Sequence, residues 1–222
     1  MDQTDKVFFD ACAHGDLDIV KNALADGANV NVVNGENRTA LMRASKRGHL
    51  DVIKYIIENG ADATKIDVNG KDALMAAAKK GHLDIVNLLI EHGADVNLQD
   101  NRGRNALMRA SFLGQTPVVL RLIEAGSQVN LSDELGRTAL MEAALAFRTD
   151  VIKVLVSEGA DVNAQDHNGC TALMRASYSG FEELIVYLLG HGADIKIADK
   201  DGNLAIHYVR QHSFEDLKNY FK

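Results

Sequence analysis

Apolar residues recur along most of the chain at spacings of three and four, the period of an α-helix that buries one face. In "LDVIKYIIEN" (50–59) they fall at Leu50, Val52, Ile53, Ile56 and Ile57. The stretch "LDIVNLLIEH" (83–92) repeats the same pattern at Leu83, Ile85, Val86, Leu89 and Ile90. Each such stretch is therefore predicted to form a short amphipathic helix.

A second apolar motif precedes these stretches and changes little from one copy to the next. "ALMRAS" stands at 40–45, 106–111 and 172–177, with "ALMAAA" (73–78) and "ALMEAA" (139–144) midway between. The motif predicts a first helix of about eight residues. The residues just before it are good N-caps, namely Thr39, Asp72, Asn105, Thr138 and Thr171. Each repeating unit thus holds two short helices, and the return of "ALMRAS" in every second unit suggests that pairs of units were copied together.

Glycines recur at the same constant interval in three series, so the backbone geometry repeats with the sequence. One series ends the second helix and serves as its C′ residue: Gly27, Gly60, Gly93, Gly126, Gly159 and Gly192. Another lies in the polar segments between units, where Asn37 stands in the first place and is also predicted to be left-handed. The third follows the first helix and has a gap at Phe147. A bulky residue there would be strained unless the turn is remodelled or another contact offsets the strain.

These motifs resemble the ankyrin repeat over nearly the whole chain. The family pattern D-x-x-G-x-T-P-L-H-x-A-A-x-x-G-H fits "DHNGCTALMRASYSGFEELIVYLLGHGADIK" (166–196) and its sister units without insertion or deletion. The resemblance implies an all-α fold, an α-solenoid of paired antiparallel helices joined by β-hairpin-like fingers. We expect one domain over 1–222, with seven helix pairs in an elongated stack. Its parts are an N-terminal cap (1–33), full repeats at 34–66, 67–99, 100–132, 133–165 and 166–198, and a C-terminal cap (199–222).

The units depart from the family's Thr-Pro-Leu-His at two positions, with Ala in place of Pro and Met in place of His. The methionines are Met42, Met75, Met108, Met141 and Met174. A thioether cannot donate the hydrogen bonds of the family's histidine, so a packed column of Met side chains is expected instead. The alternative, a soft-metal or cofactor site, is the less favoured interpretation.

Composition and motifs argue against several classes of function. The chain has 222 residues and a net charge of −7, with no apolar run long enough to span a bilayer and no basic, apolar leader at its start. These features favour a soluble monomer in the cytoplasm, without a membrane partner. Cys12 and Cys170 have no metal or redox spacing, and no phosphate loop, nucleophile elbow or H-E-x-x-H occurs. Neither an enzyme, a cofactor nor a metal site is expected.

The resemblance also implies where contacts lie, because ankyrin proteins concentrate them on the finger tips and the outer face of each first helix. We call this surface the groove face. Its positions in this chain include thirteen Lys or Arg, namely Arg38, Arg43, Lys46, Arg47, Lys71, Lys79, Lys80, Arg102, Arg104, Arg109, Arg137, Arg175 and Lys200. They include only four acids, Glu36, Glu134, Glu142 and Asp201. The groove face would carry +9, and the rest of the chain −16.

Apolar and aromatic side chains on the same face complete the predicted contact set: Phe112, Leu113, Leu135, Leu145, Tyr178 and Tyr208. An apolar centre beside a charged flank is typical of a protein interface. The sequence therefore predicts a protein-binding module that recognises, sequesters or inhibits an acidic partner. Two alternatives stay open. One is nucleic-acid or oligonucleotide binding, with Phe112 and Tyr178 stacking on bases, and the other is a regulatory domain excised from a larger enzyme.

Overall fold

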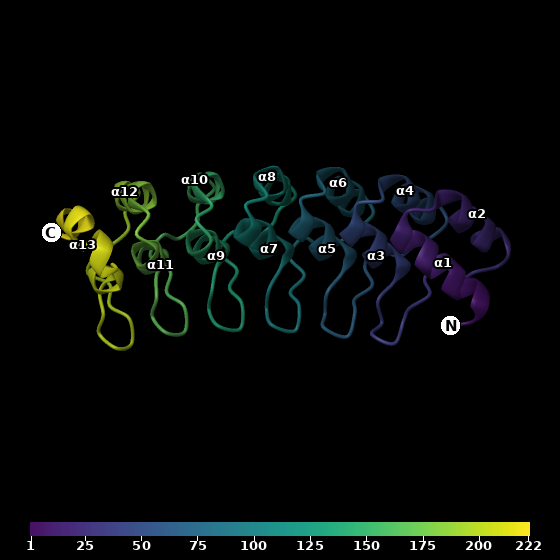
Figure 1. Ribbon diagram of the computed structural model, residues 1–222, viewed down its shortest axis with the longest axis horizontal. Coiled ribbons are helices and arrows are strands. Elements are labelled where there is room, and N and C mark those ends of the chain that lie inside the picture. The colour runs from purple at the N-terminus through teal and green to yellow at the C-terminus, as the bar shows by residue number, and fades with distance from the viewer.

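A computed structural model describes all residues 1–222 as an elongated stack with an inner row of helices, an outer row and a row of fingers (Figure 1). The inner helices are α1 (Gln3–His14), α3 (Ala40–Arg47), α5 (Ala73–Lys80), α7 (Ala106–Leu113), α9 (Ala139–Leu145) and α11 (Ala172–Ser179). The outer helices are α2 (Leu17–Ala25), α4 (Leu50–Glu58), α6 (Leu83–Glu91), α8 (Thr116–Glu124), α10 (Thr149–Ser157) and α12 (Glu182–Gly190). The predicted all-α solenoid is confirmed.

The last unit is shorter than the predicted helix pair. Its inner element is a 3₁₀ helix, η1 (Ala205–Tyr208), followed by α13 (Gln211–Leu217) and a final 3₁₀ turn, η2 (Lys218–Phe221). The chain becomes extended at Val209, with φ −66° and ψ 124°, which ends the inner element at Tyr208. A terminal unit of a solenoid has only one neighbour to pack against, so a less regular helix is tolerated there.

The inner helices begin where the sequence predicts, because each cap side chain accepts a backbone N–H from its first turn. The acceptor–donor distance is 3.2 Å from Thr39 to Met42, 2.7 Å from Asp72 to Met75, and 2.9 Å from Asn105 to Met108. Thr138 and Thr171 cap α9 and α11 in the same way. The five methionines that follow the caps are buried, as expected. Two of their sulfurs also accept the N–H of the cap residue, Met42 from Thr39 and Met174 from Thr171.

One hydrophobic core runs the length of the stack, and it is built from contacts between neighbouring units. The inner helices from α1 to α11 pack in sequence, and η1 packs against α11. Cys12 lies in this core on α1, where burial raises the pKa of its thiol to about 12. Cys170 lies in the finger before α11, and both cysteines are free. Cys12 is thus a small packing residue rather than a reactive thiol.

The turn after α9 keeps the left-handed backbone of its sister turns although Phe147 occupies the glycine position. Phe147 has φ 58°, and α9 ends at Leu145, one residue earlier than the corresponding inner helices. Two contacts accompany this turn. The Phe147 ring meets Phe181 of the next unit edge-on at 6.3 Å, and Nε of Arg148 donates to the carbonyl of Phe112 at 3.1 Å. The Arg148 bond is not particular to this turn, because His49 bonds the carbonyl of Ala13 in the same way beside a glycine turn. The edge-on contact with Phe181 involves the Phe147 ring itself, and it favours the left-handed turn despite the strain.

The fingers are joined by a ladder of backbone hydrogen bonds between neighbours. Asn101 N–H donates to the carbonyl of Asn69 at 2.9 Å, and Glu134 N–H to that of Arg102 at 3.0 Å. Gly103 makes this approach possible, since it has φ 70° and a Cβ there would lie 2.7 Å from the Glu134 nitrogen. The fingers thus form a continuous, evenly spaced row (Figure 1).

A second ladder, made by asparagine side chains, links the loops that follow the outer helices. Asn130, for example, donates to the carbonyl of Gly159 and accepts the N–H of Asp161. Asn31, Asn97 and Asn163 do the same. The rung is missing where Thr64 takes the place of asparagine, because its hydroxyl donates to Asp62 instead.

Thr64→Asn is expected to add the missing rung, by donating to the carbonyl of Gly93 and accepting the N–H of Asp95. The expected gain in the free energy of unfolding is about 1 kcal/mol, the net contribution of one or two such bonds. Urea denaturation followed by circular dichroism measures it. Thr64→Ala is the control, and equal stability of the Asn and Ala variants would show that no rung forms.

Candidate functional site

A buried aspartate stands at the base of each finger from the second finger onward: Asp67, Asp100, Asp133, Asp166 and Asp199. One carboxylate oxygen holds the finger turn, as in Asp100, whose Oδ1 accepts the N–H of Arg102 at 2.9 Å and of Arg104 at 3.0 Å. The other oxygen is left for a further partner. A buried carboxylate is costly unless it is paired, so each of these aspartates needs a donor.

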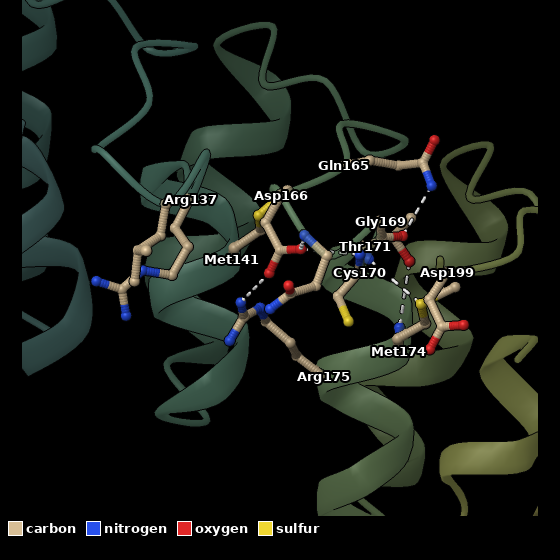
Figure 2. A network of polar contacts seen from close by, with 12 residues as sticks. Arg137, Met141, Gln165, Asp166, Gly169, Cys170, Thr171, Met174, Arg175 and Asp199 are labelled. Carbon is tan, nitrogen blue, oxygen red and sulfur yellow. Dashed lines mark hydrogen bonds and ion pairs between the residues drawn. The ribbon is translucent and has the colours of Figure 1, made fainter. Parts of the chain in front are cut away.

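The donor comes from the inner helix of the same unit in two repeats. Arg109 pairs with Asp100, and Arg175 pairs with Asp166 at 2.6 Å, at the same sequence separation in both units. Figure 2 shows Arg175 reaching from α11 to Asp166 at the base of its finger. The Arg109 side chain is 11% exposed and that of Asp100 only 1%, so this pair is largely removed from solvent.

Where that helix position has no arginine, a finger arginine takes over. Arg137 donates to Asp133 of its own finger at 2.6 Å and lies 3.1 Å from Glu142, which is buried at the helix position itself. Arg38 reaches forward from the preceding finger to Asp67, with Nε 3.2 Å from Oδ2. The aspartates of the first four of these fingers therefore each have an arginine partner.

In the last unit a tyrosine replaces the arginine. Tyr208 donates its hydroxyl proton to Asp199 at 2.5 Å and lies 3.3 Å from Sγ of Cys170. The hydrogen bond to Asp199 raises the pKa of the Tyr208 phenol, and the same bond lowers the pKa of the Asp199 carboxyl to about 2. This tyrosine ties the C-terminal finger to its helix rather than presenting a free hydroxyl.

Arg43 is the one arginine of the repeated "ALMRAS" motif without a buried carboxylate. Asn34 stands before it at the position where the later units have aspartate. The Arg43 guanidinium instead lies over the ring of Phe9 at 5.0 Å, and it is 3.8 Å from the exposed Asp10. With 37% of its side chain exposed, Arg43 remains accessible from solvent.

Five predicted contact residues are thus engaged in bonds within the molecule: Arg38, Arg109, Arg137, Arg175 and Tyr208. The aspartates that neutralise them do not contribute to the +9 of the groove face. The excess of +9 is therefore larger than the free positive charge on this surface. The sequence does contain a signal for these pairs. In three units, the Asp of the family's D-x-x-G motif is followed at one fixed separation by an Arg or a Tyr.

The cations that remain unpaired concentrate in the N-terminal half. Lys46 and Arg47 end α3, Lys79 and Lys80 end α5, and Lys71 stands in the finger between them. All five line one depression of about 440 Å³ whose other lining residues are Asn34, Arg38, Met42, Arg43, Asp67, Asp72, Met75, Ala76 and Arg109. The pKa of Lys79 is lowered, mainly because the side chain is partly buried. The positive charges of Arg109 and of the neighbouring lysines lower it further. We call this depression the basic cleft.

The predicted apolar contact residues lie farther along the same face. Phe112 (α7), Leu135 (the finger before α9), Leu145 (α9) and Tyr178 (α11) are 36 to 57% exposed, whereas Leu113 is half-buried. The ring of Tyr178 is covered in part by the guanidinium of Arg210 at 4.3 Å. Arg102 and Arg104 make no salt bridge and belong to the finger before α7. The structure thus orders the predicted residues into a basic N-terminal half and an apolar patch beyond it.

Two other kinds of site have no matching features. No three or more His, Cys, Asp or Glu side chains are grouped as they would need to be to hold a metal ion. None of the helices has the length and apolar character needed to cross a membrane.

Comparison with known proteins agrees with this architecture. The family model described as "Ankyrin repeats (3 copies)" matches residues 8–100, 94–166 and 147–218. Among solved structures, the crystal structure of the human ASB11 ankyrin repeat domain is similar with a TM-score of 0.85, at 27% identity over 96% of each chain. The search of curated proteins found no match. Ankyrin repeats generally serve as protein-protein interaction modules and are typically not catalytic. The helix pairs, the fingers and the family match together show that this chain belongs to the ankyrin-repeat family.

Proposed function

We propose that this chain is a non-enzymatic binding module that holds an acidic partner protein against its groove face. The observation that carries the proposal is the cluster of five unpaired cations around one depression, on the face that also exposes Phe112, Leu135 and Leu145. Surface charge steers a complementary partner and raises the rate of association. Exposed apolar side chains supply affinity once they are buried.

Lys79, Lys80, Arg102 and Arg104 are expected to act mainly on association. Reversing all four to Glu should lower the association rate constant at least tenfold while changing the dissociation rate less, since long-range attraction speeds encounter. The partner is first isolated by pull-down with mass spectrometry, and stopped-flow mixing then gives both rates. A variant with Lys21, Lys54, Lys153 and Lys196 reversed to Glu changes net charge equally away from the groove face. Equal slowing in both variants would remove the groove face from the interface.

Salt dependence in the same experiment separates a protein partner from nucleic acid. A steep log–log dependence of affinity on salt, together with retention on single-stranded nucleic acid, would favour the nucleic-acid alternative.

Phe112→Ala with Leu145→Ala is expected to weaken partner binding by about 2 kcal/mol, roughly 30-fold, because both side chains would lose apolar contacts buried in the complex. The melting temperature should be nearly unchanged, since both are exposed in the free protein. Calorimetric titration measures the affinity. Leu120→Ala with Val186→Ala removes similarly exposed side chains from outer helices and serves as the control. Full affinity, or weaker binding only in step with unfolding, would show that the patch is structural.

A further inference from the structure

The basic cleft is a local feature of two units and not a repeated property of the stack. The last two residues of α3 and α5 are Lys46, Arg47, Lys79 and Lys80. The corresponding residues of the later inner helices are all uncharged: Phe112, Leu113, Leu145, Ala146, Tyr178 and Ser179. Solenoid geometry places the same positions on the same face in every unit. The positive charge therefore comes from the residues that α3 and α5 carry at these positions, and not from the fold itself.

Charge in the basic cleft is not balanced within the molecule. Of the cations that line it, Arg38 is paired with Asp67, Arg109 is paired with Asp100, and Arg43 lies 3.8 Å from Asp10. Asp72 also lines the cleft, and one carboxylate balances at most one of the five cations that remain. Lys46, Arg47, Lys71, Lys79 and Lys80 form no salt bridge, and desolvation and mutual repulsion lower the pKa of Lys79. A bound anion would relieve this repulsion, so the cleft has a specific electrostatic reason to take one.

The kind of cation indicates the kind of anion. Arginine forks bind one phosphate or carboxylate in fixed, bidentate geometry. Of the arginines that line the cleft, Arg38, Arg43 and Arg109 already lie beside carboxylates, and only Arg47 has no acidic partner. Four of the five unpaired cations are lysines, which are point charges on flexible stems. They reach the cleft from three separate elements, α3, a finger and α5. Several carboxylates spread across the cleft suit this arrangement better than one compact phosphate.

We propose that the basic cleft binds a short, extended segment of the partner with three or four clustered Asp or Glu residues. Neighbouring helices are spaced about 10 Å apart, a distance that about three extended residues cover. This inference rests on the proposed function and makes it more specific. The acidic segment would lie over α3 and α5, and the apolar part of the partner would contact Phe112 and Leu145 farther along the stack.

A fluorescein-labelled peptide of ten glutamates tests the proposal by fluorescence anisotropy at low salt. We expect saturable 1:1 binding, at least about tenfold weaker for Lys79→Glu with Lys80→Glu. The matched control, Lys54→Glu with Lys196→Glu, makes the same change in net charge away from the cleft and should alter binding less than about twofold. Amide shifts in two-dimensional NMR should be confined to α3, α5 and their fingers.

Three results would overturn the proposal. The first is an equal loss of decaglutamate affinity in the cleft variant and in the control variant. The second is a set of NMR shifts spread over the outer helices. The third is tighter binding of a phosphoserine peptide or a ten-nucleotide oligothymidylate than of decaglutamate. Failure here is distinguishable from failure of the proposed function. If decaglutamate does not bind the cleft but partner affinity still depends on Phe112 and Leu145, only the acidic-segment inference is lost.

Discussion

Replacing Arg109 by Met is expected to lower the free energy of unfolding by about 3 kcal/mol. Asp100 is 1% exposed and would keep its two backbone donors but lose its only cation. Removing one partner of a buried ion pair leaves the other charge uncompensated, and this typically costs about 3–5 kcal/mol. Methionine keeps most of the side chain's length, so packing changes little. Urea denaturation monitored by circular dichroism gives the difference.

Arg43→Met is the matched control, because Arg43 occupies the same position of the same "ALMRAS" motif. Asn34 stands where the later units have the buried aspartate, so this variant should lose less than about 1 kcal/mol, mainly the contact with Phe9. Similar losses in the two variants would contradict the assignment of Arg109 to a structural pair. The comparison also separates the predicted contact residues that hold the fold together from those that are free to meet a partner.

Asp72→Asn is expected to stabilise the protein by about 2–3 kcal/mol at pH 7.5. Asp72 caps α5 while 3% exposed, and burial raises the pKa of its carboxyl from 3.8 to about 6. A raised carboxyl pKa means that ionisation opposes folding. The penalty is fully present above pH 6, decreases as the pH falls through 6, and is gone below about pH 4, where the folded and unfolded chains are both protonated.

Asparagine removes this penalty without removing the cap, since Asn105 makes the same hydrogen bond at the start of α7, at 2.9 Å. The gain measured by urea denaturation should therefore shrink from pH 7.5 to pH 4. Thr39→Asn changes the equivalent cap of α3 without adding or removing a titrating group, and its effect should not vary with pH. A gain from Asp72→Asn that is the same at both pH values would show that the carboxyl is not responsible.

Much of the fold could be predicted because its determinants are local. The helix pairs follow from apolar spacing, their first residues from side chains such as Thr39 and Asn105, and their ends from glycines that adopt positive φ. Phe147 marks the limit of this local reasoning. The missing glycine indicates strain, but the edge-on contact of the Phe147 ring with Phe181 comes from the neighbouring unit and cannot be read from the local sequence.

The candidate site was less predictable, because the role of an arginine depends on what lies beside it in space. Arg43 and Arg109 stand in identical hexapeptides, yet one is solvent-accessible and the other is paired with a buried aspartate. Arg38 bonds to Asp67 across two fingers, a relation that no single unit contains. The repeat positions of the charged residues therefore predict a basic face, but they overstate its free charge.

The sequence by itself determined the repeating architecture, since a constant repeat length with a fixed apolar face leaves stacking as the way to bury that face. The resemblance to the ankyrin family, carried by the same residues, predicted which positions line the groove face. Only the tertiary structure decided which cations there are free, because pairing depends on distances between side chains of different elements. It likewise showed that the free cations of α3, α5 and their finger meet around one depression. Secondary structure is set mostly by near neighbours in the chain, whereas the electrostatics of a surface are set by near neighbours in space.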